Sequence, residues 1–496
     1  MNVAKNKSQP SLLLALIPVV ILISLLTVSV TLFKDQSSSG PNQLSLMLAA
    51  GITILIGLRQ GLTWKELEKS IGAGIASSIN AILILLIVGA LIGSWILAGI
   101  VPSMIYYGLS IINPHLFYGT ACIICAIIAL ATGSSWITAG TIGTALIGIA
   151  AAQDLHLGLA AGAIISGSYF GDKMSPLSDT TNLASATGDV EIFTHIQHMI
   201  WTTAPSFLIA VLLFFSIGQF LPVPSEINEL DDLLFALTEH FTIGPHLLIP
   251  IFIVTGLVIK KTPAFLALLY GALIGGVFAG LFQQALLMKS FETNSFLFAF
   301  ALVKEIWTAL YAGVTLDSGN QMLDELLSRG GMSSMIMPVW LIISAMTFGA
   351  VMETTGMLEV IFRRIIKNIR STGDLIASTA ACAIGINVIT SDQYIAIVLP
   401  GRIFRDVYRR QLLEPKNLSR TLEDAGTLTS VLIPWNTCGV FMAQTLGVST
   451  LTYAPFAFFN LVCPVVATTF GYNNIGITKL SATQQKVSTK NKSRLN

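Results

Sequence analysis

Long apolar runs recur along the whole chain, separated by short polar segments. Residues 11–33, 79–101, 201–221 and 262–282 are the clearest of these runs. Each approaches or exceeds the roughly 20 apolar residues that an α-helix needs to cross a bilayer. The pattern therefore predicts an all-α polytopic membrane protein whose main partner is the lipid bilayer.

Lysine and arginine in the short loops indicate how the chain is oriented in the membrane, because short loops rich in these residues tend to stay in the cytoplasm. Lys5 and Lys7 place the N-terminus inside, and the basic residues of 479–496 place the C-terminus on the same side. The acidic stretch 226–239 then lies outside. We predict a first transmembrane repeat (1–221), an acidic extracytoplasmic linker (222–244), a second transmembrane repeat (245–478) with an insertion at about 289–335, and a basic cytoplasmic tail (479–496).

The two halves share sequence features at a constant separation. Residues 132–137 resemble residues 390–395, with 390 − 132 = 258, and Pro434 follows Pro176 by the same interval. Recurrence of this kind is typical of transporters built from inverted repeats. We therefore expect two inverted-topology repeats with broken helices. The segment around Ser134 forms either two crossings or a re-entrant hairpin, since both return the chain to the same side.

Composition and charge exclude several classes of protein. Hydrophobic residues make up 53% of the chain and charged residues 11%, with 27 basic against 26 acidic side chains. That balance argues against a nucleic-acid partner. The sequence contains neither a GxxxxGK[ST] run for ATP nor an HExxH motif for zinc. Cys122 and Cys125 have the spacing of metal ligands, but their apolar surroundings favour a packing role. We predict a transporter without a cofactor or an enzymatic activity.

A cluster of polar residues interrupts an apolar segment at 167–183. Lipid offers no partner to bare backbone groups, so a broken helix at membrane depth survives only inside protein or beside a water-filled cavity. Carboxylate, hydroxyl, amide and carbonyl oxygens are suitable ligands for sodium. We predict a sodium site with Asp172 and Asp179 as charged ligands; the alternative is a solvated loop at the membrane edge. The neutral ligands and supporting residues of this segment are Thr180, Asn182, Lys173 and Pro176.

The second half contains a counterpart of this segment at 425–444. It includes Pro434, Asn436 and Thr437 but no carboxylate, so we expect the charged ligands mainly from the first half. Asn436 and Thr437 are further candidate neutral ligands.

The matched segments 132–136 and 390–394 form a second candidate set. They contribute Ser134, Ser135 and Asp392, although close helix packing explains the serines equally well. Glu353 is a further candidate within an apolar run, with pairing to a cytoplasmic arginine as the alternative. His195 and His198 follow the broken segment, and we interpret them as solvated interfacial residues rather than pH sensors.

The string Gly-Asp-Lys-Met-Ser-Pro-Leu-Ser-Asp-Thr-Thr-Asn at 171–182 resembles the NhaC family of sodium/proton antiporters. Residues 90–99, 132–140 and 433–437 add weaker similarity. The resemblance implies exchange of sodium, as transported substrate, for protons across a bacterial inner membrane. Some relatives with similar motifs couple both ions to malate and lactate, so small carboxylates are an alternative cargo. A homodimer is one oligomeric state that the sequence leaves open.

Antiport requires two ions to compete for one site, and a carboxylate provides such a site. Burial favours the neutral acid, whereas a bound sodium ion favours the ionised form. We expect Asp172 or Asp179 to exchange the two ions. A third alternative, an intramembrane aspartyl protease, is prompted by Gly171 and Asp172. Such enzymes carry Gly-x-Gly-Asp, and Tyr169 stands where the first glycine would be.

Overall fold

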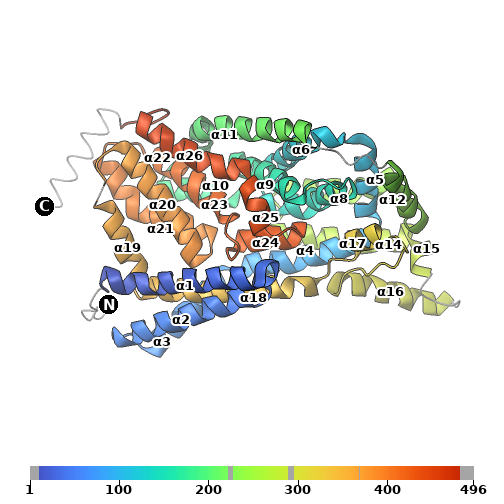
Figure 1. Ribbon diagram of the computed structural model, residues 1–496, viewed down its shortest axis with the longest axis horizontal. Coiled ribbons are helices and arrows are strands. Elements are labelled where there is room, and N and C mark those ends of the chain that lie inside the picture. The colour runs from blue at the N-terminus through green and yellow to red at the C-terminus, as the bar shows by residue number, and fades with distance from the viewer. Residues whose placement is uncertain (1–9, 222–226, 289–294, 368, 481–496) are drawn as a thin grey trace.

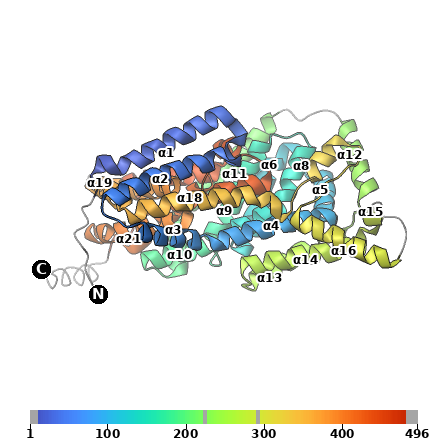
Figure 2. The same ribbon diagram turned by 90° about the horizontal axis from the view of Figure 1, so that it is seen from below.

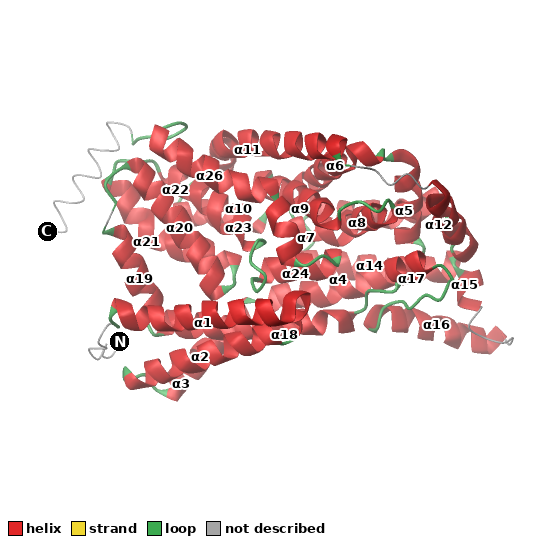
Figure 3. Ribbon diagram, in the orientation of Figure 1, coloured by secondary structure: helices red, strands yellow, loops and turns green. Residues whose placement is uncertain are grey.

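The computed structural model describes residues 10–221, 227–288, 295–367 and 369–480 (Figure 1). Helices joined by loops make up the fold over these ranges (Figure 3). Nine helices in the described ranges are long and apolar enough to cross a membrane, or eleven candidate spans if each of two bent helix pairs counts as one. The predicted all-α polytopic class is confirmed. Lys5, Lys7, Glu226, Lys289 and residues 481–496, used in the sequence-based predictions, lie outside the described ranges.

The first half contains α1 (Leu12–Phe33), α2 (Pro41–Arg59), α3 (Trp64–Ser77), α4 (Ile79–Leu97), α5 (Ile100–Ile111), α6 (Phe117–Thr132), α7 (Ser135–Thr138), α8 (Thr144–Ala152), α9 (Leu157–Met174), α10 (Asp179–Gly188) and α11 (Ile192–Phe220). A π-helical turn, η3 (Ala139–Gly143), joins α7 to α8. The linker region contains α12 (Ile227–His240).

The second half contains α13 (Ile249–Ile259), α14 (Ala264–Phe282), α15 (Gln284–Met288), α16 (Ser295–Tyr311), α17 (Gln321–Leu327), α18 (Ile336–Thr354), α19 (Met357–Ile366), α20 (Thr372–Thr390), α21 (Gln393–Arg410), α22 (Pro415–Leu422), α23 (Leu428–Ser430), α24 (Thr437–Leu446), α25 (Thr450–Tyr453) and α26 (Phe458–Asn473). A second π-helical turn, η6 (Glu423–Thr427), joins α22 to α23.

Local chemistry moves two helix boundaries away from those of the apolar runs. The run 79–101 is divided, because Gly99 adopts a left-handed φ of 73° and starts α5 in a new direction. The run 201–221 is only the later part of α11. Glu191 starts that helix nine residues earlier by accepting hydrogen bonds from the backbone N–H groups of Phe193 (2.9 Å) and Thr194 (2.7 Å).

Two large hydrophobic cores hold the helices together, and each draws on both halves of the chain. In one, α1, α2 and α10 pack with α18 to α22. Figure 2 shows α1, α2 and α18 side by side. In the other, α4 to α9 pack with helices of the second half that include α13, α14 and α24. Neither half therefore completes a core by itself.

The halves also repeat backbone geometry at the interval of 258 residues seen in the sequence (391 − 133). Left-handed residues occur in the pairs Gly133 and Ser391, Asp154 and Leu412, and Asp189 and Gly447. Helix N-caps occur in the pairs Ser134 and Asp392, His156 and Glu414, Ser178 and Asn436, and Glu191 and Ser449. These matches support a structural repeat. The inverted direction of the two repeats in the membrane stays a prediction.

Candidate functional site

The polar string at 171–182 predicted a broken helix in the first half. The structure has this break between α9 and α10. Pro176 has no backbone N–H to continue α9. Ser178 then caps α10 by accepting a hydrogen bond from the N–H of Thr181 at 3.3 Å. Asn182 donates its side-chain amide to the carbonyls of Pro176 (3.0 Å) and Ser178 (2.6 Å), which holds the turn together.

Residues 132–136, which run from the end of α6 into α7, are called the first tip, and their counterparts 390–394, from the end of α20 into α21, the second tip. The first tip packs directly against this break. Gly133 ends α6 with a φ of 69°, and a Cβ at this position would collide with Leu177. Ser134 caps α7 by accepting from the N–H of Ile137 at 3.3 Å. The close approach of Gly133 to Leu177 places Ser135 beside the end of α9.

Asp172 in the last turn of α9 faces the first tip. Its Oδ2 accepts hydrogen bonds from the backbone N–H of Ser135 at 3.0 Å and from its hydroxyl at 2.7 Å. Its Oδ1 is buried without a hydrogen-bond partner in the described part of the chain. Asp172 is 5% exposed and Lys173 fully buried, so the alternative of a solvated loop is wrong for these two residues.

A cavity of about 500 Å³ reaches this carboxylate. Asp172 forms part of its buried wall, whereas Asp179, Asn182 and Lys261 are exposed on it. Thr132, Ser134, Trp136, Pro176 and Tyr394 also line it. The cavity therefore connects the surface with Asp172, and its charged lining residues within the described ranges are Asp172, Asp179 and Lys261.

Asp179 accepts hydrogen bonds from residues of both halves of the chain. Its Oδ1 accepts from the N–H of Thr180 at 2.9 Å, and its Oδ2 accepts the hydroxyl hydrogen of Tyr394. Thr180 is buried, and its hydroxyl lies 3.1 Å from that of Ser178 rather than in the cavity lining. Of the two predicted charged ligands, Asp172 is thus the enclosed one and Asp179 the exposed one.

The equivalent parts of the second half contact each other, and of their residues Gln393 and Tyr394 line the cavity. Asp392 caps α21 by accepting from the N–H of Ile395 at 2.9 Å. The N–H of Thr437 donates to the carbonyl of Ser391 at 2.9 Å, and the amide of Asn436 donates to the carbonyl of Asn387 at 3.2 Å. Asp392, Asn436 and Thr437 are buried but do not line the cavity.

Glu353 lies apart from these residues. It is exposed at the C-terminal end of α18 and does not line the cavity. Pro434, the last of the predicted residues, lies in the turn between α23 and α24.

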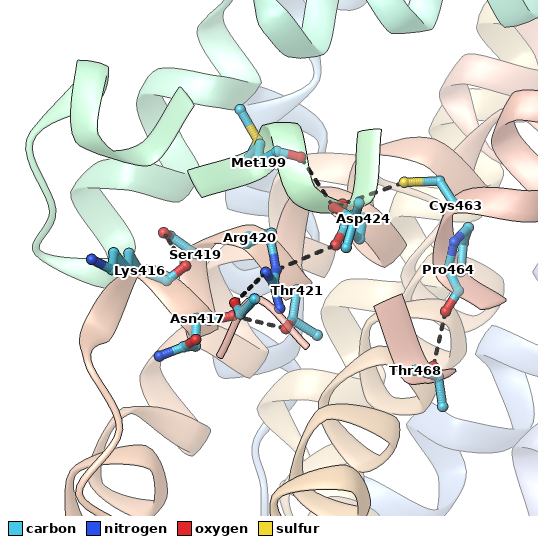
Figure 4. Close-up of polar contacts among 12 residues, drawn as sticks. Met199, Lys416, Asn417, Ser419, Arg420, Thr421, Asp424, Cys463, Pro464 and Thr468 are labelled. Atoms are coloured by element: carbon cyan, nitrogen blue, oxygen red, sulfur yellow. Dashed lines mark hydrogen bonds and ion pairs between the residues drawn. The ribbon is translucent and has the colours of Figure 1, made fainter. Parts of the chain in front are cut away.

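Lys173, the neighbour of Asp172, has a different environment. Its ammonium forms an ion pair with Asp424 in η6 and lies 3.4 Å from the Sγ of Cys463. The hydroxyl of Thr202 on α11 donates to the same carboxylate at 3.0 Å. Figure 4 shows Arg420 and Cys463 reaching Asp424 from opposite sides, with Arg420 Nε 3.9 Å from Asp424 Oδ2. Lys173 therefore forms its ion pair with a residue of the second half, Asp424, and does not line the cavity.

The sequence pattern missed Arg420, Glu423 and Asp424, all of which are buried. Arg420 ends the basic stretch 402–420, and Glu423 and Asp424 follow it, and the charge of that stretch is typical of a cytoplasmic loop. The expectation that the charged ligands come mainly from the first half stays a prediction: the carboxylates that line the cavity, Asp172 and Asp179, belong to that half, whereas Glu423 and Asp424 are buried in the second half outside the cavity lining. Lys173 could have pointed to them, because a lysine within an apolar segment requires a nearby countercharge.

The interpretation of His195 and His198 as solvated residues is also wrong. Both are buried on α11, and His195 Nδ1 lies 2.8 Å from the hydroxyl of Ser419 on α22. Cys122 and Cys125 are buried free thiols at the contact of α6 with α9.

Comparison with known proteins identifies the family. Residues 167–475 match the model of the Na+/H+ antiporter family. The chain is 39% identical over 434 residues to the Na+/H+ antiporter NhaC of Alkalihalophilus pseudofirmus, covering 88% of this chain and 90% of the relative. It is 37% identical to the malate-2H+/Na+-lactate antiporter of Bacillus subtilis, covering 90% and 92%. It is 34% identical to the arginine/ornithine antiporter ArcD of Halobacterium salinarum, covering 94% and 93%. The chain is a multi-span membrane protein that belongs to the Na+/H+ antiporter family, with the NhaC antiporters among its relatives.

Proposed function

We propose that this protein exchanges sodium ions for protons across a bacterial inner membrane, with Asp172 as the group that binds either ion. The observation that carries the proposal is the Asp172 carboxylate itself. One of its oxygens is fixed by Ser135, and the other is unpartnered among the described residues, while the side chain lines a cavity that extends to the surface.

Competition between the ions follows from this arrangement. A buried carboxylate is costly unless it is protonated or paired with a cation. A proton on Asp172 and a sodium ion beside it each remove that cost, and the two exclude one another. Ser134, Asn182 and Asp179 line the same cavity and are the side chains that would complete a sodium site.

The basic residues indicate which side this cavity faces. Lys261 is exposed at the cavity, next to Lys260 in the short loop between α13 and α14. The preference of such loops for the cytoplasm supports an inward-facing cavity and cytoplasmic termini. Release to the other side requires the two halves to move relative to each other around Asp172.

Exchange of organic acids is the second candidate, since one relative is a malate-2H+/Na+-lactate antiporter. Two aspartates and one lysine line the cavity, and Lys173 is paired with Asp424 elsewhere. This excess of negative charge disfavours an anionic cargo and favours a cation. The aspartyl-protease alternative has no support, because the relatives that cover nearly the whole chain are antiporters.

Purified protein in liposomes that contain a pH-sensitive dye tests the proposal. Sodium, potassium, malate, lactate and arginine are supplied one at a time and in pairs. We expect sodium alone to drive proton movement in the opposite direction. Proton movement that requires malate, lactate or arginine in addition to sodium would replace this proposal with the corresponding organic exchange.

A further inference from the structure

A second cavity, of about 590 Å³, lies between α17 and α8, and the start of α9 and the end of α24 complete its wall. Among the described residues, none lines both this cavity and the one at Asp172. Ile137 lines the cavity at Asp172, and Ile147, in the same helical segment, lines the second (147 − 137 = 10). With a rise of about 1.5 Å per residue, the two positions are about 15 Å apart. The segment 135–152 therefore borders both cavities.

The two cavities belong to opposite sides of the predicted topology. α17 packs against α12, the helix of the acidic linker, and the distribution of basic residues predicts that this linker lies outside. Lys261, at the cavity of Asp172, belongs to a loop that is predicted to be cytoplasmic. The second cavity therefore belongs to the outer side in this topology.

The segment 313–331, hereafter the lid, folds back on itself and carries α17. Its two ends pair, because the N–H of Val314 donates to the carbonyl of Arg329 at 3.2 Å. Its base is fixed to α4, where the N–H of Gly331 donates to the carbonyl of Gly89 at 2.7 Å. A Cβ on Gly89 would lie 2.4 Å from the carbonyl oxygen of Gly331, so the close approach requires glycine. The lid is therefore one folded unit attached to α4 at its base.

Arg329 fastens the lid to the opposite wall of the cavity. Its Nη2 donates to the carbonyl of Thr144, at the start of α8, at 3.1 Å. Its Nη1 lies beside the C-terminal end of α24, where a Cβ on Gly447 would be 3.7 Å away, and a cation is favourable at such a helix end. Its Nε is buried without a partner in the described part of the chain. Leu446, which lines the cavity here, is only 1% exposed.

We propose that the second cavity is the outer vestibule of the sodium pathway, and that the lid, fastened by Arg329, closes it in the conformation described here. The inference rests on the proposed sodium/proton exchange and gives the ion an exit on the side opposite to Lys261. With the lid closed, Arg329 also places a positive charge in that exit, which opposes the passage of a cation. Lifting the lid opens the vestibule and moves this charge away from α8.

Cross-linking tests whether the lid must move during transport. Ala151→Cys with Glu325→Cys joins α8 to the lid across the cavity. Gln321→Cys with Glu325→Cys, one turn apart on α17, is the matched control, because it puts a bridge in the same cavity without tying the lid to α8. The five native cysteines are buried and should not compete. Bifunctional methanethiosulfonates of increasing length form the bridges, mass spectrometry verifies them, and a reductant removes them.

We expect the bridge between α8 and the lid to reduce sodium/proton exchange in liposomes to background, and the reductant to restore it. The bridge within α17 should leave exchange at the level of the parent protein. Unchanged exchange with α8 bridged to the lid, or failure of that pair to bridge with any of the reagents, would overturn the proposal.

A second measurement does not depend on transport. A cysteine replacing Leu446 should react slowly with a maleimide in detergent, because the closed lid covers it. We expect Arg329→Met to raise that rate about ten-fold by removing a charged hydrogen bond. Arg329→Lys keeps a cation, should show a smaller rise, and serves if the methionine variant fails to fold. Arg364→Met, on an exposed residue of α19, is the control.

The two measurements separate this inference from the proposed function. A labelling rate that neither Arg329 variant changes would overturn the role of Arg329 in closing the lid. Absence of sodium/proton exchange in the parent protein would overturn the proposed function, and the labelling rates would still decide whether Arg329 holds the lid closed.

Discussion

The hydroxyl of Tyr394 donates a hydrogen bond to Asp179 and thereby joins the second half of the chain to the broken helix of the first. Trp136 occupies the equivalent position of the first tip (394 − 136 = 258) and stacks on Phe441 of α24, with ring centroids 4.1 Å apart and an interplanar angle of 13°. Each tip therefore contacts the broken segment of the other half. Any movement of one half against the other must change these two contacts.

Tyr394→Phe removes the hydrogen bond to Asp179 and keeps the ring. A hydrogen bond to a charged group is worth about 1.5–3 kcal/mol, so we expect the conformation described here to lose at least about ten-fold in relative population. A cysteine replacing Lys261, which is exposed on the cavity, should then react more slowly with a maleimide from the cytoplasmic side. Tyr311→Phe, on an exposed residue, is the control. An unchanged labelling rate would show that the bond does not hold this conformation.

Neutralising the cavity carboxylates should impair transport more than folding. Asp172→Asn cannot exchange a proton, so we expect sodium-dependent proton flux in liposomes to fall to background. Asp179→Asn should retain partial flux, because Asp179 is exposed. Gel filtration establishes that the variants remain folded. The proposed site is wrong if both purified variants transport like the parent protein.

The buried pair of Lys173 and Asp424 should be strongly coupled in stability. Removal of one partner from a buried ion pair costs about 3–5 kcal/mol, whereas apolar replacement of both is often nearly neutral. We expect Lys173→Met and Asp424→Leu each to lower the unfolding temperature in detergent, and the double variant to recover much of the loss. Arg363→Met, which breaks an exposed pair with Glu359, should have little effect. Simple additivity of the two single changes would contradict a direct interaction.

Orientation can be measured with single cysteines in intact cells. The distribution of basic residues places Lys367 in the cytoplasm and Glu239 outside. Both side chains are exposed. An impermeant reagent should label Glu239→Cys, and it should label Lys367→Cys only after the membrane is made permeable. The reverse pattern would invalidate the predicted topology and the inward-facing assignment of the cavity.

Membrane voltage should drive the exchange. Exchange of two protons, one each on the cavity carboxylates Asp172 and Asp179, for one sodium ion moves one net charge, which is worth about 2.3 kcal/mol for each 100 mV. Liposomes clamped with potassium and valinomycin should show a rate and a reversal point that shift with the imposed potential. Exchange that ignores the potential would exclude the second proton while leaving Asp172 as the site of electroneutral exchange.

Much of the fold was accessible from the sequence because lipid imposes a simple rule on composition. The apolar runs located α1 and α14 to within two residues at their ends. The break after α9 was found because Pro176 and its polar neighbours cannot continue a helix in an apolar environment. The interval of 258 residues in a few motifs anticipated the repeated caps and left-handed residues.

The remaining site residues depend on contacts that no local pattern contains. Lys173 and Asp424 are 251 residues apart, and their pairing is a property of how α9 and η6 pack. Arg420, Glu423 and Asp424 follow a run of arginines that resembles a cytoplasmic loop, so their burial was not evident from composition. Asp392 and Asn436 resembled cavity ligands because their residue types suit sodium, yet their side chains serve as helix caps.

The sharing of each hydrophobic core between the halves also constrains how the protein is made. A ribosome releases α1 and α2 long before α18 to α22, the helices against which they pack. The early helices must therefore enter the bilayer and remain there without their final neighbours, surrounded by lipid, until the rest of the chain has been inserted. Final packing is consequently a late event in biogenesis, and a ribosome that stalls after the linker leaves a fragment inserted in the membrane with neither core complete.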